Sequence, residues 1–237
     1  MATEKEKYKK GILTAKPGTQ VLPETVKTGV QQLNPANERD GYLYVPPLYD
    51  KSRPAALAVM LHGAGAVAAQ GLHLLQRYAD ASNMILVAPA SRKYTWDIIA
   101  DRVFGPDVFF IDQVLTTVFE QYAIDTGHLA IGGFSDGASY AFSLGLSNGD
   151  LFSHIIAFSP GFAYALQRRG KPSVFISHGV NDTVLPIGPC SRRIVPQLKQ
   201  QGLEVKYTEF KGGHEVPDAI VASAVQWFTG QPAVDKL

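Results

Sequence analysis

Short apolar segments alternate with longer amphipathic segments along most of this chain, and this alternation limits the folds that it can adopt. We expect strands at residues 56–61, 84–88, 129–132, 155–158, 174–177 and 205–210, and helices at residues 67–81, 107–122, 136–146, 191–201 and 217–228. Strands that alternate with helices pack as a mostly parallel sheet with helices on its faces. The sequence therefore predicts the α/β class, with a mostly parallel central sheet flanked by helices.

The chain has 237 residues, of which 46% are hydrophobic and 18% charged, values typical of one folded domain. We expect residues 1–10 to form a charged, unstructured tail, residues 11–230 a single domain and residues 231–237 a C-terminal tail. Residues 11–15 and 41–45 are predicted to pair as antiparallel strands, separated by a polar, turn-rich segment. Only about fifteen residues separate the strands that end near Phe158 and begin near Val174, too few for an inserted cap domain.

Charge and composition exclude several classes of partner. The 22 basic and 21 acidic residues give a net charge of +1, without the basic excess that nucleic-acid binding requires. No apolar stretch is long enough for a secretion signal or a membrane span, which predicts a cytoplasmic protein that does not insert into membranes. Cys190 is the only cysteine, which excludes an internal disulfide framework and any multi-cysteine zinc or iron–sulfur site. We expect no metal and no cofactor. Oligomeric state is not predicted by the sequence.

The pattern Gly-Phe-Ser-Asp-Gly at residues 133–137 lies directly between a predicted strand and a predicted helix. A serine in such a turn is held in a strained conformation with its hydroxyl above the sheet, and the glycines avoid collisions with the neighbouring strand and helix. Ser135 is therefore a candidate nucleophile. The alternative is an ordinary glycine-rich turn, so residues elsewhere in the chain must decide.

A serine hydroxyl needs a base, and the base needs an acid that orients it. Asp182 and His214 follow the ends of two later predicted strands, and parallel strands bring their carboxyl ends to one edge of the sheet. The order Ser135, Asp182, His214 is the order of a nucleophile–acid–base triad in this type of fold. His178 is an alternative base, and Asn181 and Asp218 are alternatives to Asp182.

Acyl transfer also requires hydrogen-bond donors for the oxyanion. The loop Leu-His-Gly-Ala-Gly at residues 61–65 follows a strand, and we assign the donors to the backbone N–H groups of Ala64 and Asp136. Residues 63–68 also fit the dinucleotide-binding pattern G-x-G-x-x-A, which predicts an acidic residue at the end of the next strand. That strand instead continues into Pro89 and Ala90.

Taken together, these motifs, with His-Gly-x-x-Asp-x-Val-Leu-Pro from residue 178 and Gly-Gly-His-x-Val-Pro from residue 212, resemble the phospholipase/carboxylesterase branch of the α/β-hydrolase superfamily. The likeness covers about residues 40–228, and polyhydroxyalkanoate depolymerase-like esterases are similar too. The resemblance implies a serine carboxylesterase with Ser135 as nucleophile, His214 as general base and Asp182 as acid partner. Its expected partner is a small ester.

Four residues on the surrounding loops are candidate substrate contacts: Trp96, Phe134, Leu185 and Val216. An apolar or aromatic ring around the serine would suit a short acyl or aryl group. For each of them ordinary core packing is the alternative. A thioesterase, a polyester depolymerase, a non-catalytic ligand-binding protein and a nucleotide-dependent oxidoreductase remain alternative functions.

Overall fold

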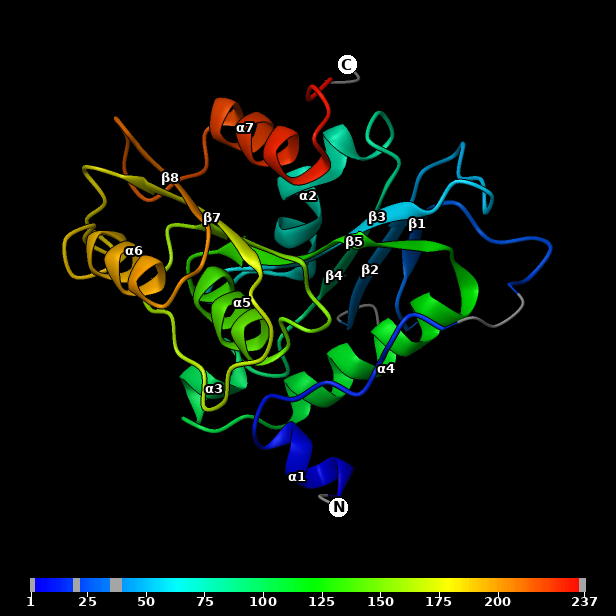
Figure 1. Ribbon diagram of the computed structural model, residues 1–237, viewed down its shortest axis with the longest axis horizontal. Helices are drawn as coiled ribbons and strands as arrows, with labels where there is room; N and C mark the ends of the chain where they lie inside the picture. The colour runs from blue at the N-terminus through cyan, green and yellow to red at the C-terminus, as the bar shows by residue number, and fades with distance from the viewer. Residues whose placement is uncertain (1–2, 19–21, 35–39, 235–237) are drawn as a thin grey trace.

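A computed structural model describes residues 3–18, 22–34 and 40–234 of the chain. Its eight strands form one sheet in the order β1-β2-β4-β3-β5-β6-β7-β8 (Figure 1). The strands are β1 (Gly29–Gln32), β2 (Gly41–Val45), β3 (Ala55–Leu61), β4 (Met84–Pro89), β5 (Ile124–Phe134), β6 (His154–Phe158), β7 (Ser173–Gly179) and β8 (Val205–Phe210). Strands β3 to β8 run parallel to one another, whereas β1 and β2 are antiparallel at one edge. The predicted fold class is confirmed.

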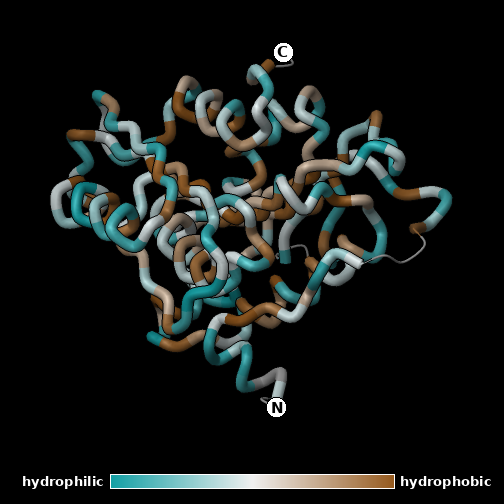
Figure 2. The backbone as a smooth tube through the Cα atoms, in the orientation of Figure 1, coloured by the Kyte–Doolittle hydropathy of each residue, from teal (hydrophilic) through white to brown (hydrophobic). Residues whose placement is uncertain are grey.

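Helices cover both faces of the sheet (Figure 1). One face packs against α2 (Ala68–Ala79) and α7 (Asp218–Thr229), and the other against α4 (Pro106–Gln121), α5 (Asp136–Ser147) and α6 (Ser191–Gln200). Every residue of β3 and β4 is buried, as expected for strands covered on both sides. Figure 2 shows hydrophobic residues concentrated along these central strands. The predicted strands and helices between residues 55 and 229 are confirmed, with ends that differ by a few residues.

The predicted strand at residues 11–15 is wrong. The strand that pairs with the outer edge of β2 is β1, which ends at Gln32 and so overlaps the first two residues of the polar, turn-rich segment expected at residues 31–40. Residues 35–39 of that segment lie outside the described part of the chain. Residues 12–15 belong to no strand or helix, and their backbone bonds to side chains: the N–H groups of Thr14 and Ala15 donate to Asp112 on α4, and that of Leu13 donates to Asn148. The apolar pattern of residues 11–15 is compatible with a strand. However, side-chain oxygens, and not a neighbouring strand, accept the backbone N–H groups of Leu13, Thr14 and Ala15.

The expectation of an unstructured tail at residues 1–10 is also wrong in part, because residues 4–8 form the short helix α1 (Glu4–Tyr8). The ring of Tyr8 lies edge-on to Phe109, with ring centroids 5.4 Å apart, and its hydroxyl donates to Asp112. Residues 1–2 and 235–237 of the two predicted tails lie outside the described part of the chain.

The connections at the carboxyl edge of the sheet are short. Residues 159–172, all of them described, join β6 to β7 without a helix or strand, so no cap domain is inserted there, as predicted. Helix α3 (Asp97–Ala100), which we did not predict, is a single turn in the connection that follows β4. Among the described residues no helix is both long and apolar enough to cross a membrane.

Candidate active site

Ser135 occupies the turn between β5 and α5, with φ of 58° and ψ of −121°. A positive φ is costly for a residue with a Cβ atom, and such strain is stored mainly at functional sites. A Cβ atom on either Gly133 or Gly137 would collide with the carbonyl oxygen of Leu61 on β3. The two glycines therefore permit the close approach of turn and strand that the sequence pattern predicted.

The side chains of Ser135, His214 and Asp182 form a continuous hydrogen-bonded chain. The Nε2 atom of His214 lies 2.8 Å from Ser135 Oγ, and its Nδ1 atom lies 2.6 Å from Asp182 Oδ2. Because an ionised carboxylate only accepts, Nδ1–H donates to Asp182 and Nε2 accepts the serine hydroxyl. The loops after β5, β7 and β8 thus bring together the three residues that we had singled out, across the carboxyl edge of the sheet.

Asp182 is held by more than the histidine. Its side chain has no exposed surface, and its Oδ1 atom accepts the backbone N–H groups of Val184, at 2.9 Å, and Leu185, at 2.8 Å. Burial alone would raise the pKa of this carboxyl, but the hydrogen bonds from His214 and from the two amides outweigh it, and the pKa is lowered. Asp182 is therefore kept ionised and fixed in orientation.

His178, the alternative base, lies on the other side of Asp182 and is completely buried. Its Nε2–H donates to the Leu185 carbonyl oxygen at 2.7 Å, and the same nitrogen lies 3.3 Å from Asp182 Oδ2. Its Nδ1 atom lies 2.7 Å from the hydroxyl of Ser191. Burial lowers the pKa of His178, consistent with a neutral ring. The structure therefore brings His214, and not His178, to Ser135.

The two alternatives to Asp182 lie elsewhere. Asn181 is exposed, and its backbone N–H donates to Gly212 at 3.0 Å. Asp218 is in the first turn of α7, where it forms an ion pair with Arg77 of α2. An acidic residue at the start of a helix interacts favourably with the helix dipole.

The loop after β3 lies beside Ser135, because a Cβ atom on Gly63 would be 3.4 Å from the Cβ of Ser135. The backbone N–H groups of Gly63 and Gly65 donate to Gln70 Oε1 and to the Tyr94 carbonyl oxygen. In contrast, the N–H groups of Ala64 and Asp136 have no acceptor within the described residues. These two groups are the ones that we had assigned as oxyanion donors.

Comparisons with known proteins point to one type of fold. No family model matches the chain. Feruloyl esterase C of Emericella nidulans is 29% identical over 172 residues, which cover 69% of this chain and 61% of that protein. The chain spans about three fifths of the length of the curated relatives that it matches.

Among solved structures, esterase PE8 superposes with a TM-score of 0.61 at 23% identity, over 78% of this chain and 97% of that one. A CE1 ferulic acid esterase from Anaeromyces mucronatus superposes with a TM-score of 0.59 at 21% identity, over 81% of this chain and 84% of that one. The chain has the α/β-hydrolase fold. The sheet order and the serine turn agree with that fold.

One predicted substrate contact is wrong, because Trp96 is completely buried. Its indole N–H donates to the His62 carbonyl oxygen at 2.9 Å, and its ring stacks on Tyr140 of α5 with ring centroids 5.0 Å apart. Trp96 therefore packs behind the loop after β3 and supports it. Its position in a loop at the carboxyl edge had suggested an exposed cleft residue.

The other three predicted substrate contacts are half-buried near Ser135, His214 and Asp182. The ring of Phe134 lies 4.6 Å from the ring of His214. Leu185 belongs to the loop of Asp182, and its methyl groups lie next to Gly161. Val216 lines a shallow hollow of about 470 Å³ between α2 and α7. Their contact with substrate stays a prediction.

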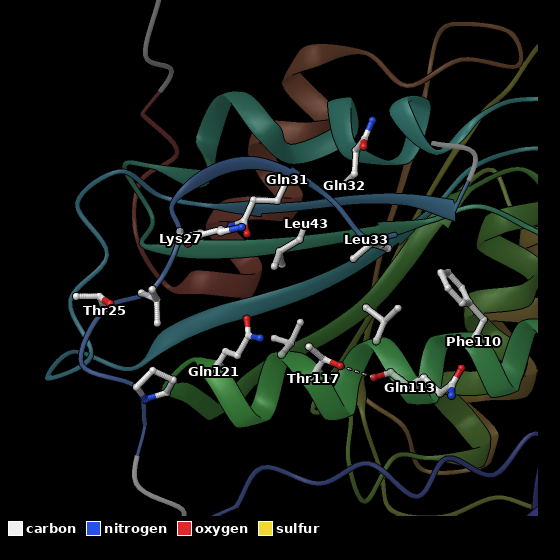
Figure 3. A pocket seen from close by; sticks show the side chains of 14 residues that line it. Thr25, Lys27, Gln31, Gln32, Leu33, Leu43, Phe110, Gln113, Thr117 and Gln121 are labelled. Carbon is white, nitrogen blue, oxygen red and sulfur yellow. Dashed lines mark hydrogen bonds between the residues drawn. The ribbon is translucent and has the colours of Figure 1, made fainter. Parts of the chain in front are cut away.

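A groove of about 530 Å³ lies between α4 and the strands β1 and β2 (Figure 3). Neutral amide side chains such as Gln113 and Gln121 border it, with Leu33 and Leu43 among its apolar residues. No triad residue lines this groove. In the described part of the chain, no group of three or more His, Cys, Asp or Glu side chains is arranged to hold a metal ion.

The sequence does not indicate two contacts that the structure shows at the candidate site. The sequence suggests His178 only as an alternative base, but its Nε2 atom lies 3.3 Å from Asp182 Oδ2. Thr95 was not considered, yet its hydroxyl donates to the carboxylate of Asp136 at 2.7 Å. No local sequence pattern indicates either contact. Thr95 and Asp136 are distant in the chain, and the contact between His178 and Asp182 depends on tertiary packing.

Proposed function

We propose that this chain is a serine carboxylesterase that hydrolyses carboxylic esters through an acyl-enzyme. One observation carries the proposal: a serine in a strained turn, at the start of an unbroken hydrogen-bonded chain from Ser135 through His214 to Asp182. A serine, a histidine and a buried carboxylate in this relation can activate a hydroxyl toward a carbonyl.

In the proposed first step, Ser135 Oγ attacks the ester carbonyl while His214 Nε2 takes the hydroxyl proton. Asp182 stabilises the resulting imidazolium, and the N–H groups of Ala64 and Asp136 bind the oxyanion. The alcohol then leaves with the proton from His214, which forms the acyl-enzyme. In the second step a water molecule gives its proton to His214 and attacks the acyl carbon, and Ser135 leaves with that proton. The chain's own groups supply every proton acceptor and donor, so no cofactor enters these steps.

An ester with a short acyl or aryl group is the proposed substrate. The curated relatives are named feruloyl esterases, and the aromatic ring of Phe134 beside His214 would suit a flat aryl group near the serine. Phe134, Leu185 and Val216 are the proposed substrate contacts. A cytoplasmic location is part of the same proposal and rests on the sequence alone.

The test compares the wild type with Ser135→Ala on p-nitrophenyl acetate, p-nitrophenyl butyrate and methyl ferulate, beside a thioester and a polyester film. Loss of the nucleophile should lower kcat by at least about three orders of magnitude and abolish labelling by a fluorophosphonate. Ser147→Ala is the matched control, because its buried hydroxyl on α5 has no hydrogen-bond partner in the structure. A wild type that hydrolyses nothing in the panel, or an active Ser135→Ala variant, would contradict the proposal. Faster hydrolysis of the thioester or of the polyester film than of the other esters would change the proposed substrate class but not the proposed roles of Ser135, His214 and Asp182.

A further inference from the structure

Three consecutive residues, Tyr94, Thr95 and Trp96, each contact the segments that carry the two proposed oxyanion donors. The carbonyl oxygen of Tyr94 accepts the N–H of Gly65, at 2.8 Å, in the loop of Ala64. The ring of Tyr94 lies so close to Gly65 that a Cβ atom there would collide with it. The first residue of the three is thus fixed against the loop after β3.

Trp96 fixes the same loop from behind. Its indole N–H donates to the His62 carbonyl oxygen, and its ring packs between the imidazole of His62, with centroids 4.8 Å apart, and the ring of Tyr140. Tyr140 belongs to α5, the helix that begins at Asp136. The indole therefore spans from the loop after β3 to the helix after Ser135.

Thr95 lies between these two contacts and reaches the second donor segment. Its hydroxyl donates to Asp136 Oδ2 at 2.7 Å, and the side chain is only 8% exposed. A hydrogen bond to a carboxylate is stronger than one between neutral groups. This bond ties the loop after β4 to the residue whose backbone N–H is the proposed donor.

The three residues are themselves held at both ends. Asp107, at the start of α4, accepts the backbone N–H of Arg92 with one carboxylate oxygen and that of Asp97 with the other, each at 2.7 Å. Asp107 is 1% exposed. The segment from Arg92 to Asp97 is therefore fixed to α4 and cannot move freely relative to the sheet edge.

We propose that Thr95 is a positioning residue that sets the separation of the Ala64 and Asp136 N–H groups in the oxyanion hole. This inference rests on the proposed function. An oxyanion needs both donors at about 2.7–3.1 Å, and an error of about 1 Å costs on the order of 100-fold in rate. Thr95 acts through Asp136, whereas Tyr94 and Trp96 fix the partner loop.

The test replaces Thr95 by valine, which keeps the shape and removes the hydroxyl, and by serine, which restores the hydroxyl. For Thr95→Val we expect kcat to fall on the order of 10-fold to 100-fold, with KM changed by less than about twofold. Affinity for a trifluoromethyl ketone, which forms an oxyanion on the enzyme, should fall by a similar factor. Thr95→Ser should recover most of the loss. Thr117→Val, on the exposed side of α4, is the matched control.

A double-mutant cycle separates positioning from a general loss of structure. Asp136→Ala removes the carboxylate and keeps the backbone N–H, so Thr95→Val should have little further effect in that background. Equal effects of Thr95→Val in both backgrounds, or a lowered melting temperature with unchanged kcat and ketone affinity, would overturn the inference. An active wild type with a fully active Thr95→Val variant would overturn the inference alone, whereas an inactive wild type would overturn the proposed function.

Discussion

The Nε2 atom of His178 lies 3.3 Å from Oδ2 of Asp182, the same carboxylate oxygen that His214 contacts from the opposite side. Asp182 therefore has a histidine on each side, of which only His214 reaches Ser135. The buried ring of His178 also bonds to the Leu185 carbonyl oxygen and so fixes the loop that holds Asp182.

Replacing His178 by phenylalanine should weaken the fold and the activity together. The change leaves the Leu185 carbonyl and the buried Ser191 hydroxyl without this partner, and we expect a loss of about 1–3 kcal/mol in the free energy of unfolding. Urea unfolding and ester hydrolysis measure the two effects. His128→Phe, at a half-exposed site in β5, should lower the free energy of unfolding by less than about 1 kcal/mol. An unchanged unfolding curve for His178→Phe would show that the ring does not support the loop.

Gly137→Ala should disrupt the serine turn. The added Cβ atom would collide with the carbonyl oxygens of Leu61 and His62, which belong to the backbone and cannot move aside cheaply. We expect the free energy of unfolding to fall by more than about 2 kcal/mol. We also expect the variant to lose most of the proposed esterase activity. Gly188→Ala is the control, since nothing lies within 4 Å of its added Cβ. Wild-type stability of Gly137→Ala would contradict the packing described here.

Asp107 should make stability depend on pH between about 4 and 6. Burial raises the pKa of this carboxyl to about 6, the hydrogen bond from Arg92 opposes the rise, and the charge of Asp97 adds to it. In that range the folded protein keeps a proton that the unfolded chain releases, so the free energy of unfolding falls as pH rises. Asp107→Asn does not titrate at this position.

The stability advantage of the wild type over Asp107→Asn should therefore shrink from pH 4 to pH 7, by up to about 3 kcal/mol. Urea unfolding at several pH values measures it. Asp97, whose pKa burial also raises, interacts with the charge of Asp107, so the comparison reports the titration of the two carboxyls together. Parallel curves of stability against pH would mean that Asp107 titrates in the folded protein as it does in the unfolded chain.

Asp112→Ala should release the N-terminal segment from α4. One carboxylate accepts the backbone N–H groups of Thr14 and Ala15 and the hydroxyls of Tyr8 and Thr14. We expect a loss of about 1–3 kcal/mol in the free energy of unfolding and faster trypsin cleavage at the lysines between residues 7 and 16. Gln113→Ala, exposed on the same helix, should leave both unchanged. Equal cleavage rates for the two variants would contradict the role of Asp112.

The parts of the fold that were predictable from sequence are those in which local pattern and tertiary structure agree. Strands β3 and β4 are buried on both faces, so their continuous apolar residues identify them. The grouping of Ser135, Asp182 and His214 follows from the parallel sheet, because each residue comes directly after the carboxyl end of a strand.

The wrong predictions concern segments whose structure is decided by distant contacts. β1 is a polar edge strand, which carries little hydrophobic pattern. Residues 11–15 have the pattern of a strand, but Asp112 and Asn148 supply their acceptors from helices about a hundred residues away. Trp96 lies in a loop, where exposure was a reasonable expectation, but its burial depends on His62 and Tyr140.

The proposed general base lies in the loop that follows β8, which comes after the other seven strands in the sequence and lies at an edge of the described sheet, beside β7. A nascent chain that has already folded the serine turn and the loop of Asp182 still lacks its imidazole until β8 pairs with β7. Under the proposed function, turnover would begin only after this pairing, so the appearance of activity during translation or refolding would report the addition of β8 to the sheet.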